Sequence, residues 1–135
     1  MICRYAHMRI SSWVSAMHQL IKACKALSDE TRLRILHILM EQSCCVCEVV
    51  QALGISETRA SRNLTTLHDA GFLKQTREGA WCLYSIDEGR AVGYSRDLIR
   101  VVGEALEGDE AVLRDRQRLR SAAESPRRGQ PPGLR

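Results

Sequence analysis

Two short stretches of helical periodicity, separated by a glycine-containing turn, are the feature that most limits how this 135-residue chain can fold. The first stretch runs from Cys47 to Leu53 and stops at Gly54, a residue suited to the end of a helix. The second begins at Ser56, whose side chain makes a good N-cap, and runs to Ala70. Two helices this close in sequence form a helix-turn-helix, in which the second helix can enter the major groove of DNA.

Basic and hydroxyl-bearing side chains occupy the outer face of the second helix. Arg59 and Arg62 are three residues apart and share a face, from which either can reach guanine edges or phosphates. Short hydroxyl side chains contact phosphates. Taken alone, this pattern also fits an ordinary solvated helix face. The predicted DNA-binding residues are Ser56, Thr58, Arg59, Ser61, Arg62 and Thr65, with Arg77 in the turn that follows the next strand.

A β-hairpin is expected directly after the second helix. Phe72–Thr76 and Trp81–Ile86 contain the bulky and β-branched residues typical of strands, and a turn at 77–79 separates them. A hairpin in this place is the wing of a winged helix-turn-helix. The predicted fold class is therefore mainly α with a small β-hairpin.

Amphipathic helices are expected on both sides of this unit. Apolar residues recur at helical spacing from Met17 to Leu27, and Ser28 can cap the helix that follows. From Ala91 to Leu106 the apolar stripe is wider than one small domain needs, so we predict a dimer. The expected divisions are an N-terminal arm over 1–16, a DNA-binding and dimerisation domain over 17–110, and a basic, disordered tail over 111–135.

Composition excludes several function classes. Lys and Arg outnumber Asp and Glu by 20 to 16, and the net charge of +4 favours a polyanionic partner. No signal peptide or unbroken apolar span is visible, so we expect a cytosolic chain without a membrane partner. No paired carboxylates, glycine-rich phosphate loop or Cys/His nucleophile arrangement stands out, so we expect neither an enzyme nor an organic cofactor.

Three of the six cysteines stand within four consecutive positions, at Cys44, Cys45 and Cys47. Because the cytosol keeps thiols reduced, we expect metal binding or redox chemistry rather than a disulfide framework. Thiolates are soft donors that select soft or borderline ions, so the cluster predicts a site for a thiophilic ion. The alternatives are oxidation of these thiols in a redox sensor and simple burial in the core.

Five stretches of the chain, taken in order, carry a family resemblance: Ala26–Leu36, Leu53–Ser56, Ala60–Leu64 with Leu67, Ala70–Leu73 and Arg77–Trp81. Together they resemble the ArsR/SmtB family of metal-responsive bacterial repressors, from about Leu20 to Ala105. The resemblance implies a homodimer joined through terminal helices. It also implies binding to double-stranded operator DNA with two-fold symmetry, and repression of detoxification genes until a metal arrives.

The resemblance also bears on the cysteines. Arsenic-sensing and cadmium- or lead-sensing members carry a Cys-Val-Cys ligand motif where this chain has Cys45 and Cys47, which implies arsenite or antimonite as inducer, with cadmium or lead as the alternative. The arsenic-type pattern has a third cysteine where this chain has Val50, so a third ligand is sought from Cys44, Cys24, Cys3 or the partner subunit.

Helix geometry sets a condition on this site. Residues two apart in a regular helix point about 200° from each other. Cys45 and Cys47 are therefore expected to hold one ion only if the start of the helix unwinds, and that distortion is the predicted route to operator release.

Overall fold

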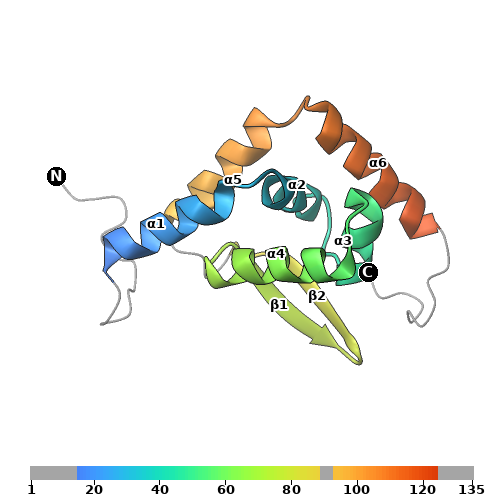
Figure 1. Cartoon of the computed structure of the whole chain (residues 1–135), viewed down its shortest axis with the longest axis horizontal. Coiled ribbons are helices and arrows are strands. Elements are labelled where there is room, and N and C mark those ends of the chain that lie inside the picture. The colour runs from blue at the N-terminus through green and yellow to red at the C-terminus, as the bar shows by residue number, and fades with distance from the viewer. Residues whose placement is uncertain (1–14, 89–92, 125–135) are drawn as a thin grey trace.

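Six helices and one two-stranded sheet make up the part of the chain that the computed structural model describes, residues 15–88 and 93–124 (Figure 1). The fold is a winged helix-turn-helix, as the sequence predicts, and no helix over these residues is long and apolar enough to cross a membrane. The elements are α1 (Ala16–Leu27), α2 (Glu30–Leu39), α3 (Val46–Leu53), α4 (Glu57–Asp69), β1 (Leu73–Glu78), β2 (Trp81–Ile86), α5 (Gly93–Ala105) and α6 (Glu110–Glu124).

Helix α2 is the centre of the core and packs against every other helix and against β2. Its Ile35, Leu36 and Ile38 are fully buried. The predicted N-cap is wrong by one residue, because the Asp29 carboxylate accepts the Arg32 backbone N–H at 3.0 Å. The Ser28 hydroxyl instead donates to a carbonyl oxygen in the last turn of α1, at 2.8 Å.

The helix-turn-helix follows the sequence prediction closely. Helix α3 ends at Gly54, which adopts the left-handed conformation (φ 69°) that glycine tolerates best. Two residues later Ser56 caps α4, its hydroxyl accepting the Arg59 backbone N–H at 3.1 Å. The turn is therefore short and fixed by local hydrogen bonds.

The wing is a regular antiparallel hairpin, with Leu73 opposite Ile86 and Glu78 opposite Trp81. The turn lies at 79–80, later than predicted, because Gly79 supplies the positive φ of 63° that the reversal needs. Residues 77 and 78 therefore belong to β1 and not to the turn.

Helix α6 corrects the expectation of a disordered tail over 111–135. Residues 110–124 form a helix, and its Val112 and Leu119 are almost completely buried. Asp109 caps it by accepting the Ala111 backbone N–H at 2.9 Å. The prediction used the arginine-rich composition and overlooked these two apolar residues. They are seven positions apart and so lie on one face of a helix. The predicted arm up to residue 14 and the chain from 125 onward lie outside the described residues.

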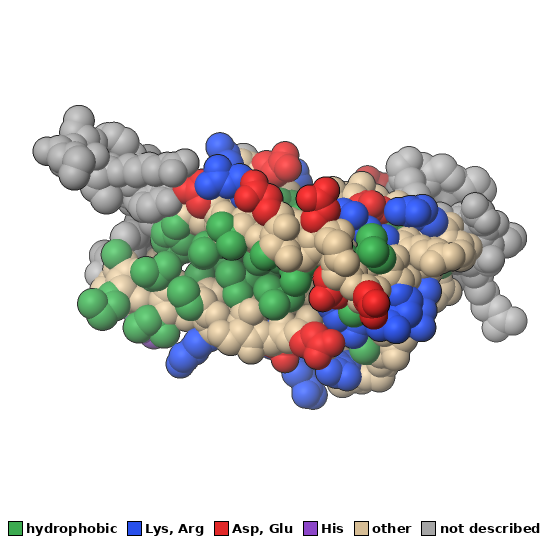
Figure 2. All heavy atoms as spheres, turned by 90° about the horizontal axis from the view of Figure 1, so that it is seen from above, with side chains coloured by type: hydrophobic (Ala, Val, Ile, Leu, Met, Phe, Trp, Pro, Cys, Tyr) green, Lys and Arg blue, Asp and Glu red, His purple; other side chains and the backbone are tan. Residues whose placement is uncertain are grey.

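One face of the molecule keeps its apolar side chains exposed. Met17, Leu20 and Ile21 of α1 are 72%, 44% and 45% exposed, and Val101 of α5 is 55% exposed. The periodic stripe of α1 thus faces outward, while the small residues Ala23 and Ala26 face the core. Figure 2 shows these hydrophobic side chains gathered over the end of the molecule that α1 and α5 form.

Candidate functional site

The thiols of Cys45 and Cys47 lie together at the start of α3, with their Sγ atoms 2.9 Å apart. Cys45 is the N-cap and has an extended backbone (φ −85°, ψ 169°), while the helix itself begins at Val46. The angular spacing of a regular helix therefore does not apply to this pair. The expectation that the helix must unwind before both thiols can reach one ion is wrong.

Cys44 precedes this pair and has a hydrogen bond of its own to the backbone. Its side chain is fully buried and its Sγ lies 3.5 Å from the Gln42 carbonyl oxygen. Within residues 15–88 and 93–124, no three His, Cys, Asp or Glu side chains are grouped so as to hold a metal ion. Cys24 is exposed on α1, Cys82 lies in the wing, and Cys3 is outside the described residues.

A buried carboxylate holds the start of α3 in place. Glu48 is fully buried, and its Oε1 accepts the Cys45 backbone N–H at 3.1 Å while its Oε2 accepts the Gln42 side-chain amide at 3.2 Å. Sequence analysis missed this residue. The signal was present, because a Glu three positions after an N-cap is the spacing of a capping box, with Cys45 in the place usually taken by Ser or Thr.

Tyr84 links the cysteine segment to the wing and to α4. Its backbone exchanges two hydrogen bonds with Cys44, at 3.0 and 2.8 Å, in an isolated bridge beside the hairpin. Its hydroxyl is hydrogen-bonded to Thr65 and accepts the Gln75 amide at 3.3 Å. Burial raises the pKa of Tyr84. The residue packs as an aromatic in a strand usually does.

The predicted DNA-binding residues divide into two groups. Those exposed on the outer face of α4 are Thr58, Ser61, Arg62 and Thr65, of which Thr65 is also hydrogen-bonded to Tyr84, and Arg77 is exposed on β1. The other two make contacts within the protein. Ser56 caps α4, and the Arg59 Nη2 donates to the Thr31 Oγ1 at 2.9 Å, which ties that guanidinium to α2.

Arg32 and Asn63 form a link that sequence analysis did not identify. The Arg32 Nε donates to the Ala26 carbonyl oxygen at 2.6 Å, and its Nη1 donates to the Asn63 Oδ1 at 3.0 Å. The Asn63 amide in turn donates to the Arg59 carbonyl oxygen at 3.0 Å. Helices α1, α2 and α4 are therefore held together by side-chain hydrogen bonds beneath the outer face of α4.

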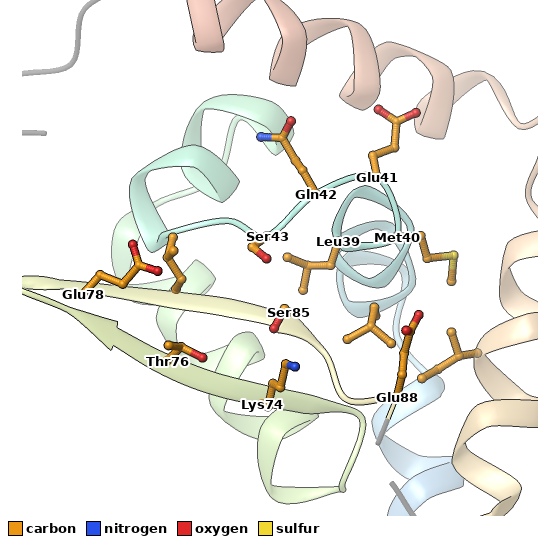
Figure 3. Close-up of a pocket in the computed structure, with 13 residues that line it drawn as sticks. Leu39, Met40, Glu41, Gln42, Ser43, Lys74, Thr76, Glu78, Ser85 and Glu88 are labelled. Carbon is orange, nitrogen blue, oxygen red and sulfur yellow. The ribbon is translucent and has the colours of Figure 1, made fainter. Parts of the chain in front are cut away.

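A separate pocket of about 470 Å³ lies between the end of α2, the wing and α5 (Figure 3). Lys74, Ser85 and Glu88 point into it, over apolar residues that include Leu39. None of the five cysteines in the described part of the chain lines it. The pocket and the thiol pair are thus distinct places in the molecule.

Residues 29–75, which hold α2, α3, α4 and the start of the wing, match the model of the bacterial regulatory protein arsR family. The chain is 43% identical over 63 residues to the arsenic resistance transcriptional regulator ArsR1 of Pseudomonas putida (46% of this chain and 49% of that protein). It is 40% identical over 68 residues to a homologue of the cadmium resistance regulator CadC of Staphylococcus aureus (50% and 56%). The chain thus spans about half the length of these two relatives.

Two other matches cover more of the length of the similar protein. A helix-turn-helix transcriptional regulator of Methanocaldococcus jannaschii is 37% identical over 81 residues, which are 59% of this chain and 86% of that protein. Among solved structures, the homodimeric winged helix-turn-helix DNA-binding domain Mb0332 of Mycobacterium bovis, a possible ArsR-family regulator, superposes with a TM-score of 0.58. That match has 29% identity and covers 70% of this chain and 83% of that one.

Proposed function

Because the chain belongs to the ArsR family of bacterial regulatory proteins, we propose that it is a dimeric repressor that leaves its operator when a thiophilic ion binds Cys45 and Cys47. Members of this family are transcriptional regulators and not enzymes. The ion proposed is arsenite or antimonite, with cadmium or lead as the alternative. The single observation that carries the proposal is the 2.9 Å separation of the two Sγ atoms at the start of the helix-turn-helix.

The outer face of α4 supports operator binding. Thr58, Ser61, Arg62 and Thr65 are exposed on one face, and none of them supplies core packing. Such a face offers one guanidinium for guanine edges or phosphates and short hydroxyls for phosphates. In this proposal Arg62 and the wing residue Arg77 contact the duplex, while Ser56 and Arg59 chiefly hold α4 in its place.

The apolar face of α1 and α5 supports a homodimer, in which residues 17–110 carry both DNA binding and dimerisation. Large exposed apolar patches on a soluble domain mark interaction sites, and a symmetric pair would cover Met17, Leu20, Ile21 and Val101. Val101→Glu places a charge in this patch without touching the core. Sedimentation should find a dimer for the parent and a monomer for this variant, whereas an unchanged dimer would assign the interface to another face.

The thiol pair fits a soft ion. Two sulfur donors converge, and Cys47 is partly exposed, so an ion can reach them from solvent. A bound soft ion would form strong bonds to thiolate sulfur. Each thiol would lose its proton, to solvent for a divalent cation or with a departing hydroxide as water for arsenite. The third donor, if the site uses one, is proposed to be Cys44 after rearrangement, Cys24, Cys3 or a residue of the partner subunit.

The position of Cys45 explains how occupation of this site would act on the DNA-binding unit. As the N-cap of α3, Cys45 connects the buried Glu48 carboxylate to the bridge that Cys44 makes with Tyr84. A change in the Cys45 backbone therefore acts on the first turn of α3 and on the wing together. Allosteric couplings of about 1–3 kcal/mol, or roughly 5–150-fold in affinity, are sufficient for regulation.

An operator-release titration tests this function. The parent dimer bound to its operator is titrated with arsenite, antimonite, cadmium, lead and zinc in the presence of a thiol reductant. The proposal expects arsenite or antimonite to weaken operator binding by roughly 5–150-fold. Release by cadmium or lead alone would assign the alternative ion, and no release by any of these ions would contradict ion sensing.

The same 2.9 Å separation favours one second candidate, a thiol redox sensor. Hydrogen peroxide would take two electrons and two protons from Cys45 and Cys47, forming one S–S bond and two molecules of water. The two sulfur atoms are in non-bonded contact, and they would have to approach by a further ~0.9 Å to reach the roughly 2.0 Å of a disulfide. Operator release by peroxide, with none by arsenite under reducing conditions, would establish this candidate in place of ion sensing.

A further inference from the structure

We propose that α6 is a strap that holds both ends of α3, with Asp115 as its anchoring residue. In this way α6 couples the thiol pair to the start of α4, the proposed recognition helix. The proposal rests on the ion-dependent release proposed above and adds to it an element outside residues 29–75, the part that matches the family model. Figure 1 shows α6 running down past α2 toward α3.

The first attachment is at the end of α3 that leads into α4. Asp115 is fully buried, and its two carboxylate oxygens accept the Arg34 Nε and Nη2, each at 2.7 Å. The same Arg34 Nη2 reaches the Leu53 carbonyl oxygen, at 3.4 Å, in the last turn of α3. The Arg118 Nη1 lies 3.6 Å from the position that a Cβ would take on Gly54. Helix α6 thus contacts the turn that precedes the recognition helix.

The second attachment is at the thiol end. Glu41, in the segment between α2 and α3, lies 3.2 Å from the Arg116 Nε and 3.8 Å from the Arg120 Nη2. Its neighbour Gln42 donates to the Glu48 carboxylate that holds the N-cap of α3. Figure 3 shows the Glu41 side chain pointing toward α6.

Buried apolar contacts join the two attachments. Val112 and Leu119 of α6 are 1% and 0% exposed, and α6 packs more extensively on α3 than on any other element. A packed interface of this kind shifts as a unit rather than deforming continuously. A change at Cys45 that moves the Glu41–Gln42 segment would therefore also move α6, and with it the Arg34 contact beside Leu53.

The test uses two substitutions at opposite ends of the strap. Asp115→Asn keeps the shape of the side chain and removes the charge that pairs with Arg34. Glu41→Gln does the same at the thiol end. Arg114→Gln is the matched control on the same helix, because Arg114 is exposed and belongs to neither attachment. Amide hydrogen exchange is measured well below the unfolding temperature of each variant.

If α6 is a strap, each substitution should speed amide hydrogen exchange at both ends of α3, and not only at the end nearest to it. Asp115→Asn should speed exchange about tenfold at both 53–56 and 46–49, and Glu41→Gln should do the same at 53–56. Arsenite should also weaken operator binding less in both variants: the ratio of the affinity without arsenite to the affinity with it should fall by about fivefold or more. Arg114→Gln should keep the ratio of the parent. Should Asp115→Asn fail to fold, Glu41→Gln carries the test.

Faster exchange confined to the neighbourhood of each substitution, with the affinity ratio of the parent retained, would overturn the strap and leave Asp115 a purely structural residue. The failure of the proposed function is separable from this result. If arsenite does not release the parent from DNA, the ion-sensing proposal fails, and exchange at the far end of α3 alone decides whether α6 is a strap.

Discussion

The two ends of the helix-turn-helix differ in how their residues are used. On the outer face of α4, side chains such as Ser61 and Arg62 are exposed and take no part in the core. At the start of α3, Cys45 and Glu48 are buried. The Cys45 thiol contacts the Cys47 thiol, and the Glu48 carboxylate accepts the Cys45 backbone N–H. Substitutions on the proposed DNA-binding surface should therefore cost the fold little, whereas loss of the buried carboxylate at the start of α3 should cost more.

This difference has a physical cause. An exposed helix face depends only on the periodicity of its own helix, so its residues are free to be selected for a partner. The thiol pair depends on an N-cap, on a buried carboxylate and on the Cys44–Tyr84 bridge, which belong to three segments. The proposed sensing end is therefore in contact with several other elements of the protein, because three segments form it.

Glu48→Ala should have the largest effect on stability among substitutions at the two ends. It leaves the Cys45 backbone N–H and the Gln42 amide without their buried acceptor and opens a cavity, at a cost of about 2–4 kcal/mol in the free energy of unfolding. Denaturant unfolding measures this cost. Ser61→Ala on the outer face of α4 is the matched comparison and should change it by less than about 0.5 kcal/mol.

Glu48→Gln refines this prediction. It preserves the volume of the side chain and one acceptor for the Cys45 N–H, so its cost should be about 1 kcal/mol. Equal costs for Glu48→Ala, Glu48→Gln and Ser61→Ala would remove the distinction between the two ends.

Sequence reasoning succeeded where local signals decide the structure. Gly54 and Ser56 gave the end of α3 and the start of α4, because a left-handed C-cap and a hydroxyl N-cap act within a few residues. The same reasoning failed for the thiol pair. It treated Cys45 as helical, although the residue is the extended N-cap, so the convergence with Cys47 was missed.

Arg62→Ala should affect function rather than stability. Its guanidinium is exposed on the outer face of α4, so its loss should weaken operator binding by roughly 5–150-fold and lower the salt dependence of binding, with little change in unfolding. Arg59→Ala is the informative contrast. Because the Arg59 guanidinium is bonded to Thr31, it should cost about 1 kcal/mol in stability and less in operator affinity.

Fluorescence anisotropy with a labelled operator at several salt concentrations, together with thermal unfolding, measures both variants. If Arg59→Ala weakened operator binding more than Arg62→Ala, the side of α4 that faces the DNA would be the one with Arg59 and not the one with Arg62.

Sequence reasoning could not find hydrogen bonds between residues that are far apart in the chain. Arg34 and Asp115 are 81 positions apart, and their two hydrogen bonds bring α6 onto α2. An arginine-rich segment alone predicts disorder, since its composition does not reveal that one buried aspartate and two apolar residues share a face. Arg32 and Asn63 were missed for the same reason, being partners 31 positions apart.

The smallest predicted effect is a pH dependence of stability that arises at His37 of α2, away from the thiols. Burial, and then the charge of Arg116, lower the pKa of His37, whose Nε2 lies 3.3 Å from the Gly103 carbonyl oxygen. The unfolded chain therefore binds a proton at His37 more readily than the folded protein does. Stability should be unaffected above about pH 6.5 and should fall as the pH decreases below it.

Urea midpoints at pH 7.5 and 5.5 measure this decrease. His37→Gln, which cannot titrate, should have a smaller decrease between the two values than the parent. An identical decrease in both proteins would place the pH dependence in other groups.

The central claim is that the thiols of Cys45 and Cys47 are the inducer site, and single serine substitutions test it most directly. A serine hydroxyl is close in size to a thiol but is a hard, neutral donor, so it removes soft-ion binding with little change in packing. Operator affinity is measured with and without arsenite under reducing conditions for the parent, Cys45→Ser, Cys47→Ser and the control Cys82→Ser. The account predicts near-parental operator affinity for all variants, with release retained in Cys82→Ser and lost in both others. Parental release from either Cys45→Ser or Cys47→Ser would contradict it.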